Sequence, residues 1–313
     1  MEGRKWYGCY KLRMTRRGLL LFAAMCLIWG IPYLLIRIAV SEISPATLVF
    51  TRTAIGALIL MPFVLARGGF RGIGAKWVPL LLFAAFEIGG PWFLMSSAEQ
   101  HISSSLAGLL VSAVPLIGVV IAPLFGNRDR IGPMGIGGLL LGLAGVAAIV
   151  GLDIRATNAT ALAEMGLVVV GYAMGPAIAS RYLQGVPSVS VTGISLAACA
   201  IAYAPVAAVQ WPRTMPSAQV FGSVAVLAVV CTALAFLLFF ALISEIGPVR
   251  ATVITYVNPA VAALLGVAVL HETLTLWMGV GFVLVLLGST VATRKPGAVA
   301  PKSAPELAGG EAL

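Results

Sequence analysis

The chain has 313 residues, of which 60% are hydrophobic and only 10% are charged. An average soluble domain has roughly 25% charged residues, and a single soluble core stops growing near about 250–300 residues, so this composition excludes an ordinary soluble protein. The net charge of +9 does not indicate a nucleic-acid partner, because the basic residues lie in short segments between apolar runs.

Ten apolar segments are long enough to cross the hydrocarbon layer of a bilayer, which takes about 20 residues. We therefore predict an all-α integral membrane protein with ten transmembrane helices. In chain order the segments are 18–36, 46–66, 77–95, 103–125, 134–151, 162–180, 189–209, 220–243, 251–270 and 276–293. A basic segment (1–17) precedes them, and a tail (294–313) rich in Pro, Ala and Gly, a composition typical of disorder, follows them.

Lys and Arg residues predict the orientation, since short loops rich in these residues stay in the cytoplasm. Alternating the ten spans places sixteen of them on one side and three on the other, while Arg52 lies within a span. We therefore expect a multi-pass protein of the plasma (inner) membrane with both termini in the cytoplasm. The same bias explains the positive net charge.

The two halves of the chain align without a gap at an offset of 144 residues. This offset places prolines and glycines at matching depths of matching spans: Pro32 on Pro176, Pro115 on Pro259, Gly135 on Gly279 and Gly137 on Gly281. We predict two five-helix repeats, 18–151 and 162–293, joined by an external linker at 152–161. Because five spans is an odd number, the second repeat must enter the membrane inverted, an architecture common among secondary transporters.

Several motifs occur in a characteristic order along nearly the whole chain, about residues 18–293. They are Trp29-Gly30, Arg52, the run from Ala98 to Gly108 that leads to Pro115, then Asn258-Pro259, Leu270-His271-Glu272 and Gly279. In these motifs the sequence resembles the EamA-type members of the drug/metabolite transporter (DMT) superfamily. The resemblance implies a central cavity between the repeats, with the fifth and tenth helices packed peripherally.

Two positions depart from the family pattern. The acidic residue expected after the fourth helix is replaced by Asn127-Arg128-Asp129, and the second repeat has Leu196 where the first has Arg52. The family roles of these two positions are therefore not transferred to this chain.

Arg52 and Glu87 are the clearest ionisable residues within the spans. A charge in the bilayer centre is costly, so each is a candidate functional residue. The helical rise places Arg52 about 9 Å and Glu87 about 12 Å below the outer ends of their spans, close enough in depth for the two side chains to meet. We expect either a structural ion pair or a cavity-lining role, and we expect Glu87 to titrate and to couple transport to protons.

Other polar and aromatic residues are candidates for the cavity wall. Trp29 and Tyr33 are four residues apart and should share a helix face. In the ninth span Thr252, Thr255, Tyr256 and Pro259 form a polar stripe to which Asn258 adds an amide, and Ser112 belongs to the smaller stripe of its repeat mate. Packing or hydrogen bonding between helices is the alternative interpretation for each of them.

Candidate gating and hinge residues are the four span prolines Pro32, Pro115, Pro176 and Pro259, with Glu99 and His101 as an outer gate. The spacing Gly138-x-x-x-Gly142 indicates close helix packing rather than chemistry. The sequence shows no metal-ligand spacing, phosphate loop or nucleophile motif, so we expect no cofactor, no metal and no catalytic residue.

These features favour a secondary transporter that moves a small metabolite or drug by alternating access, and the resemblance includes exporters. A set of Arg, Glu, Trp, Tyr and Asn side chains would suit an amphoteric substrate such as an amino acid. A passive channel or facilitator is the alternative. A membrane-embedded enzyme would need a catalytic constellation at one depth, which the sequence does not show.

Overall fold

The computed structural model describes residues 15–66, 69–70, 72–126, 132–151 and 158–293. These residues form helices and connecting turns, and no β-strand occurs among them. The basic segment up to residue 14, the linker residues 152–157, the segment Asn127-Arg128-Asp129 and the tail from residue 294 lie outside the described residues.

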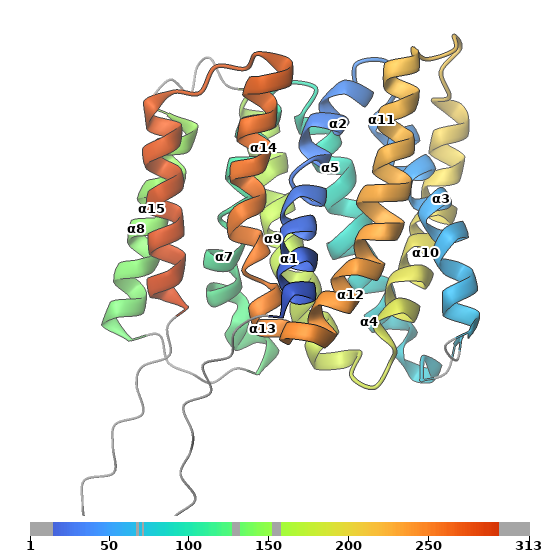
Figure 1. Ribbon diagram of the computed structural model, residues 1–313, viewed down its shortest axis with the longest axis horizontal. Coiled ribbons are helices and arrows are strands. Elements are labelled where there is room, and N and C mark those ends of the chain that lie inside the picture. Colours follow the sequence, from blue (N-terminus) through green and yellow to red (C-terminus); the bar gives the residue numbers. More distant parts are fainter. Residues whose placement is uncertain (1–14, 67–68, 71, 127–131, 152–157, 294–313) are drawn as a thin grey trace, which may run out of the picture.

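The helices fall into two successive groups that run between the same two ends of the bundle (Figure 1). The first group is α1 (Arg16–Ile28), α2 (Pro32–Ala39), α3 (Pro45–Ala66), η1 (Gly74–Lys76), α4 (Trp77–Phe83), η2 (Ala84–Gly89), α5 (Gly90–Ala98), α6 (Ser104–Val111), α7 (Val114–Ile121), η3 (Ala122–Phe125) and α8 (Pro133–Val150). The second group is α9 (Ala159–Tyr182), α10 (Ser188–Val209), α11 (Ala218–Ala228), η4 (Val229–Leu234), α12 (Ala235–Ile246), α13 (Pro248–Ala251), α14 (Ile254–Leu270) and α15 (Leu276–Ala292).

Eight helical stretches are long and apolar enough to cross a membrane. They are Arg16–Ala39, Pro45–Ala66, Gly74–Ala98, Ser104–Phe125, Pro133–Val150, Ala159–Tyr182, Ser188–Val209 and Ala218–Ile246. Two further apolar helices, α14 and α15, have 17 residues each. The chain is therefore a multi-pass membrane protein.

Local sequence explains where the helices begin and break. Side chains of Ser103, Asn158, Ser217 and Thr275 accept hydrogen bonds from backbone N–H groups in the first turn of the helix that follows each of them. Proline occupies the first or second position of α2 and α7, where it lacks only a hydrogen bond that the helix end would leave unmade. The first and fourth predicted spans are therefore each divided into two helices.

The helices of the two groups pack in reciprocal pairs. A shift of 144 residues places 45–66 on 189–210 and 133–150 on 277–294, which are nearly the bounds of α10 and α15. Helix α3 packs against α10 and α8 against α15, so each of these packs against its own counterpart. Helix α6 packs against α14, which belongs to the counterpart of its span, since the shift carries 104–121 to 248–265. In the same way α2 and α1 pack against α11 and α12, while α9 packs against α5 and α4. This pattern is that of a two-fold relation, in which patch i meets patch j and patch j meets patch i.

Helices α8 and α15 form the most extensive pair and lie at one edge of the bundle (Figure 1). Their glycines bring the two backbones together: a Cβ on Gly138 would lie 2.7 Å from the Gly288 carbonyl oxygen, and one on Gly281 would lie 2.5 Å from that of Gly145. The predicted packing role of Gly138 is therefore confirmed.

The bundle has two ends, which carry different turns. The Glu99 end carries the turns 40–44, 99–103, 210–217 and 271–275, and lies at the top of Figure 1. The opposite, Lys76 end carries the turns 183–187 and 247–253 and residues 72–76.

Candidate functional site

Arg52 lies in α3 with only 6% of its surface exposed. Its guanidinium carbon lies 3.6 Å from the centroid of the Trp92 ring, a cation–π contact. Its Nε–H donates to the Thr232 Oγ1 at 2.8 Å, and this bond joins the first group of helices to the second. Arg52 is therefore held by one ring and one hydroxyl from different parts of the chain.

Thr232 and Glu87 each belong to a π-helical segment, η4 and η2 respectively. The shift of 144 residues carries 84–89 onto 228–233, so the two π segments occupy matching places. Thr232 also donates to the carbonyl of Leu227, five residues earlier, at 2.8 Å. Single π turns within α-helices occur frequently at functional sites. No pattern in the sequence indicated them.

The expected pair of Arg52 and Glu87 does not form. Arg52 contacts Thr232 and Trp92, whereas Glu87 Oε2 is buried and makes no hydrogen bond with any described residue. Glu87 packs instead against α9, where a Cβ on Gly175 would lie 2.0 Å from this oxygen. Helical rise predicts the depth of a side chain but not the direction in which it points, and here the two side chains point apart.

Helix α10 supports η2 through the carbonyl groups that the π turn leaves free. The Tyr203 hydroxyl donates to the Gly89 carbonyl at 3.0 Å, and the Cys199 thiol lies 3.5 Å from that of Ala84. The Tyr203 ring is stacked on Phe93 with 5.8 Å between the centroids. These bonds satisfy backbone acceptors that lipid could not.

Trp29 and Tyr33 do not share a continuous helix face. Trp29 ends α1, and Tyr33 lies in α2 after the break at Gly30. Trp29 packs on Phe239 and Phe236 of α12, with centroid distances of 4.7 Å and 5.9 Å. The expectation of one shared face was wrong because it assumed an unbroken helix.

Asn258 links two helices. It is 8% exposed, and its amide nitrogen donates to the carbonyls of Cys26 (3.1 Å) and Ile254 (3.0 Å) when the amide is oriented to match its neighbours. This bonding agrees with the alternative of hydrogen bonding between helices, and the cavity-lining role of Asn258 stays a prediction. On the same helix Tyr256 is half-buried, and Thr252 just before it is exposed.

The remaining candidate residues of the spans are Ser112 and four prolines. Ser112 is buried and donates to the carbonyl of Leu109 at 2.5 Å. Among the prolines, Pro32 and Pro115 follow helix breaks, whereas Pro176 and Pro259 lie inside the continuous helices α9 and α14.

At the Glu99 end, Glu272 caps helix α6. Its carboxylate accepts from the backbone N–H groups of Ser104 (2.8 Å) and Ser105 (2.9 Å) and from both serine hydroxyls. His271 ends α14 in the left-handed conformation (φ 54°), which turns the chain so that Glu272 reaches α6. The sequence placed Glu272 near this end but did not predict the cap.

Glu99 lies beside this cap with no exposed surface, and neither carboxyl oxygen has a hydrogen-bond partner among the described residues. Arg37 donates to its backbone carbonyl. Glu99 follows the span Gly74–Ala98, and burial raises the pKa of its carboxyl well above the ordinary value. The nearby Glu272 carboxylate raises this pKa further, and Arg37 lowers it.

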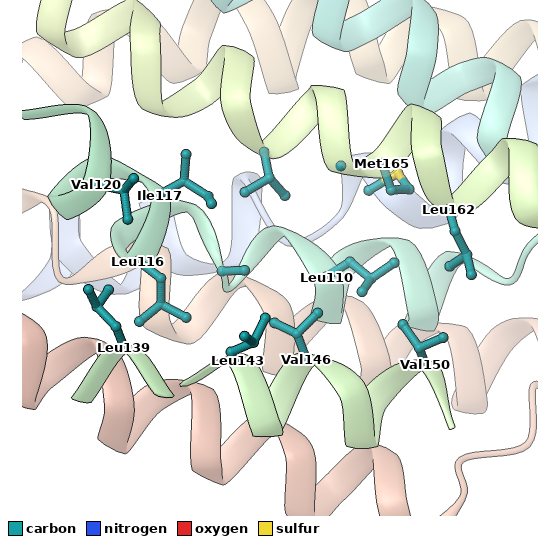
Figure 2. Close-up of a pocket in the computed structure, with 13 residues that line it drawn as sticks. Leu110, Leu116, Ile117, Val120, Leu139, Leu143, Val146, Val150, Leu162 and Met165 are labelled. Atoms are coloured by element: carbon teal, nitrogen blue, oxygen red, sulfur yellow. The ribbon is translucent and has the colours of Figure 1, made fainter. Parts of the chain in front are cut away.

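The described residues form two pockets of different character. A polar pocket of about 440 Å³ opens at the Glu99 end and is lined by Arg37, His101, Gln219 and Glu272 among others. An apolar pocket of about 340 Å³ lies between α6–α7, α8 and α9, and Figure 2 shows aliphatic side chains such as Leu116, Leu143 and Met165 around it. The apolar pocket contains none of the polar residues that the sequence singled out.

The chain is similar to several transporters along almost its whole length. It is 29% identical over 291 residues to the uncharacterized inner membrane transporter YedA of Escherichia coli (strain K12), covering 89% of this chain and 93% of YedA. It is 25% identical over 285 residues to the uncharacterized transporter YvbV of Bacillus subtilis (strain 168), covering 88% and 91%. A solved structure described only as "Crystal structure of protein" has the same fold, with a TM-score of 0.62, 23% identity and coverage of 90% and 98%.

The model of the EamA-like transporter family matches the chain twice, at residues 16–151 and 162–294. These two matches include nearly all of the residues in the transmembrane helices described above, leaving out the start of α9. The relatives named above carry transporter names that agree with this match. The chain therefore belongs to the EamA-like transporter family.

Proposed function

We propose that the protein is a secondary transporter that carries a small metabolite or drug across the plasma (inner) membrane by alternating access. The observation that carries this proposal is the position of buried Arg52 and half-buried Glu87 within spans, at or beside the two π segments where the helix groups meet. Ionisable groups inside a membrane are costly and mark transport paths. The interface between two halves is also where such carriers place their substrate site.

The proposed architecture is ten spans in two inverted halves, with both termini in the cytoplasm. Helices α14 and α15, with 17 residues each, are at the short end of the range of about 17–25 residues that crosses a bilayer. The reciprocal packing of α3 with α10, α6 with α14 and α8 with α15 supports a two-fold relation between the halves. The distribution of Lys and Arg supports the orientation, with the Glu99 end outside.

The proposed outer gate is the cluster at the Glu99 end. There Glu272 fastens the turn after α14 to the start of α6, and Arg37 fastens α2 to the end of α5. His101 lines the polar pocket at the same place. Opening this end requires these bonds to break, which would give water access to the buried Glu99 carboxyl.

The test has two stages. Untargeted comparison of metabolites inside and outside cells with and without the protein identifies the substrate, and purified protein in liposomes is then assayed for flux of that substrate. A carrier gives saturable flux and counterflow, with protein-free liposomes as the control. Flux without counterflow would identify a channel or facilitator, and conversion of the substrate would identify an enzyme.

A further inference from the structure

Arg52 is a permanent positive charge without an acidic partner. An arginine guanidinium stays protonated in proteins, so burial does not neutralise it. Of its five N–H groups, the Nε–H is the one that bonds to a described residue, Thr232. Within the described part of the chain no Asp or Glu forms an ion pair with Arg52, which leaves the two terminal nitrogens for another acceptor.

The interior acids nearest to this region are directed elsewhere. Glu87 packs on Gly175 of α9, and Glu99 lies at the end of α5 with both oxygens unbonded. No carboxylate among the described residues accepts a hydrogen bond from Arg52. A fixed internal carboxylate would occupy the guanidinium and compete with any ligand, so its absence among the described neighbours leaves Arg52 open to one.

The surroundings of Arg52 indicate the charge of the ligand. The titratable groups near enough to act electrostatically on Arg52 are Cys231 of η4, Tyr172 of α9, Tyr33 of α2 and Glu99, and none of them is a second cation. A single guanidinium matches a single negative charge, whereas a phosphate dianion would leave charge uncompensated at this buried position.

The geometry indicates the shape of the ligand. The contact with Trp92 and the bond to Thr232 fix the guanidinium on one side, and its two terminal nitrogens form a planar fork. Such a fork binds a carboxylate through two parallel hydrogen bonds. Tyr33, Tyr172 and Trp92 provide a largely aromatic surface beside it, which suits an apolar or aromatic body.

We infer that Arg52 is the anchor for the carboxylate of a singly charged organic acid with an apolar or aromatic body. This inference rests on the proposed function, because it names the chemical class of the transported substrate. Trp92 and Thr232 are positioning residues that orient the guanidinium, since the Trp92 ring stacks on it and the Thr232 hydroxyl accepts from its Nε–H.

The test uses the purified full chain in lipid nanodiscs with a panel of acids from acetate through benzoate to indole-3-acetate, each paired with its neutral amide. Acids should raise the melting temperature and slow the modification of the Arg52 peptide by phenylglyoxal, while the amides do neither. Charge-assisted hydrogen bonds predict an affinity about 10- to 100-fold lower for Arg52→Gln. Arg52→Lys should lose less, because lysine keeps the charge but not the fork.

Thr53→Val is the matched control, because Thr53 is adjacent to Arg52 on α3 but bonds only to carbonyls of its own helix, so its loss should leave acid binding unchanged. If Arg52→Gln does not fold, Arg52→Lys and the phenylglyoxal protection of the unmodified protein still decide the question. Amides that bind as well as acids, or acids that do not protect Arg52, would overturn the inference. A protein that shows counterflow of an identified substrate yet binds no acid would refute the anchor while leaving the transporter function intact.

Discussion

The two π-helical segments have matching positions but different chemistry. In η2 the ionisable residue is Glu87, whose buried oxygen has no hydrogen-bond partner among the described residues, and the segment depends on Tyr203 and Cys199 of α10 for support. In η4 the polar residue is Thr232, which bonds to its own helix and to Arg52. Thr232 of the second half is thus held by two hydrogen bonds, whereas the ionisable residues Arg52 and Glu87 both belong to the first half. The two matching segments therefore differ in the chemistry of their side chains.

The largest effect should come from removing the charge of η2. Glu87→Gln keeps the shape of the side chain and should abolish the dependence of flux on a pH gradient, because a neutral amide cannot carry a proton. Exchange of substrate in the absence of a gradient should persist. The measurement is flux into liposomes with and without an imposed gradient. Normal stability together with unchanged gradient dependence would exclude this role for Glu87.

The second prediction tests whether Glu99, whose unbonded carboxyl lies outside the π segments, also titrates. Because the folded-state pKa of Glu99 is raised, the folded protein is stabilised by its protonated form below the ordinary pKa of about 4.3. This contribution is lost as the pH rises through the folded-state pKa. Glu99→Gln should therefore flatten the decline of melting temperature with increasing pH. His101→Gln is the control, and an equal flattening in that variant would assign the pH dependence elsewhere.

A third prediction concerns Thr232 in η4. Thr232→Val preserves the shape of the side chain but removes the acceptor for Arg52, and should lower the free energy of unfolding by about 1.5–3 kcal/mol, since the lost bond involves a charge. Thr53→Val is the control, because Thr53 is buried on the same helix as Arg52 but bonds only to carbonyls of its own helix. Equal losses in thermal melts of the two variants would mean that the Arg52 bond contributes nothing particular.

A fourth prediction concerns the place of Glu87 on α9. Gly175→Ala should destabilise the protein by about 1–3 kcal/mol, because the added Cβ overlaps the Glu87 side chain. Gly166→Ala, on the same helix, should be neutral, since a Cβ there meets nothing within 4 Å. The double variant Gly175→Ala with Glu87→Gly should recover part of the loss, because the overlap includes the Cβ of Glu87 as well as its carboxylate. A melting temperature of Gly175→Ala equal to that of Gly166→Ala would contradict the contact.

The smallest effect should come from the support of η2 by α10. Tyr203→Phe removes the bond to the Gly89 carbonyl and should cost about 0.5–1.5 kcal/mol, the usual contribution of a neutral hydrogen bond. Amide exchange should increase around residues 84–93 in this variant. Tyr182→Phe, which changes an exposed tyrosine, is the control. An equal increase of amide exchange around residues 84–93 in that variant would mean that the Tyr203 bond gives η2 no particular support.

The sequence predicted the helical segments because apolar length alone determines them. The predicted segment 134–151 corresponds to α8 at Pro133–Val150, and the segment 189–209 to α10 at Ser188–Val209. The segment 251–270 was predicted as one span. In the structure α13 ends at Ala251 and α14 begins at Ile254, and a break this short leaves no signature in hydropathy.

The contacts of the site could not be predicted in the same way. Arg52 and Thr232 are 180 residues apart, and only the packing of α3 against η4 brings them together. Two carbonyl groups of η2 receive donors from α10, and the sequence of η2 does not identify those donors. Glu87 lies within its predicted span, but its packing against Gly175 was not predicted, since periodicity along one helix does not fix its rotation relative to another.

The glycine contact between α8 and α15 has a consequence for how the chain is made. Helix α8 leaves the ribosome more than 120 residues before α15, yet α15 is its main packing partner. The glycine face of α8 therefore stays without its partner until the last helix has been synthesised and inserted. A chain that stops before residue 276 would expose that face to lipid and to other proteins.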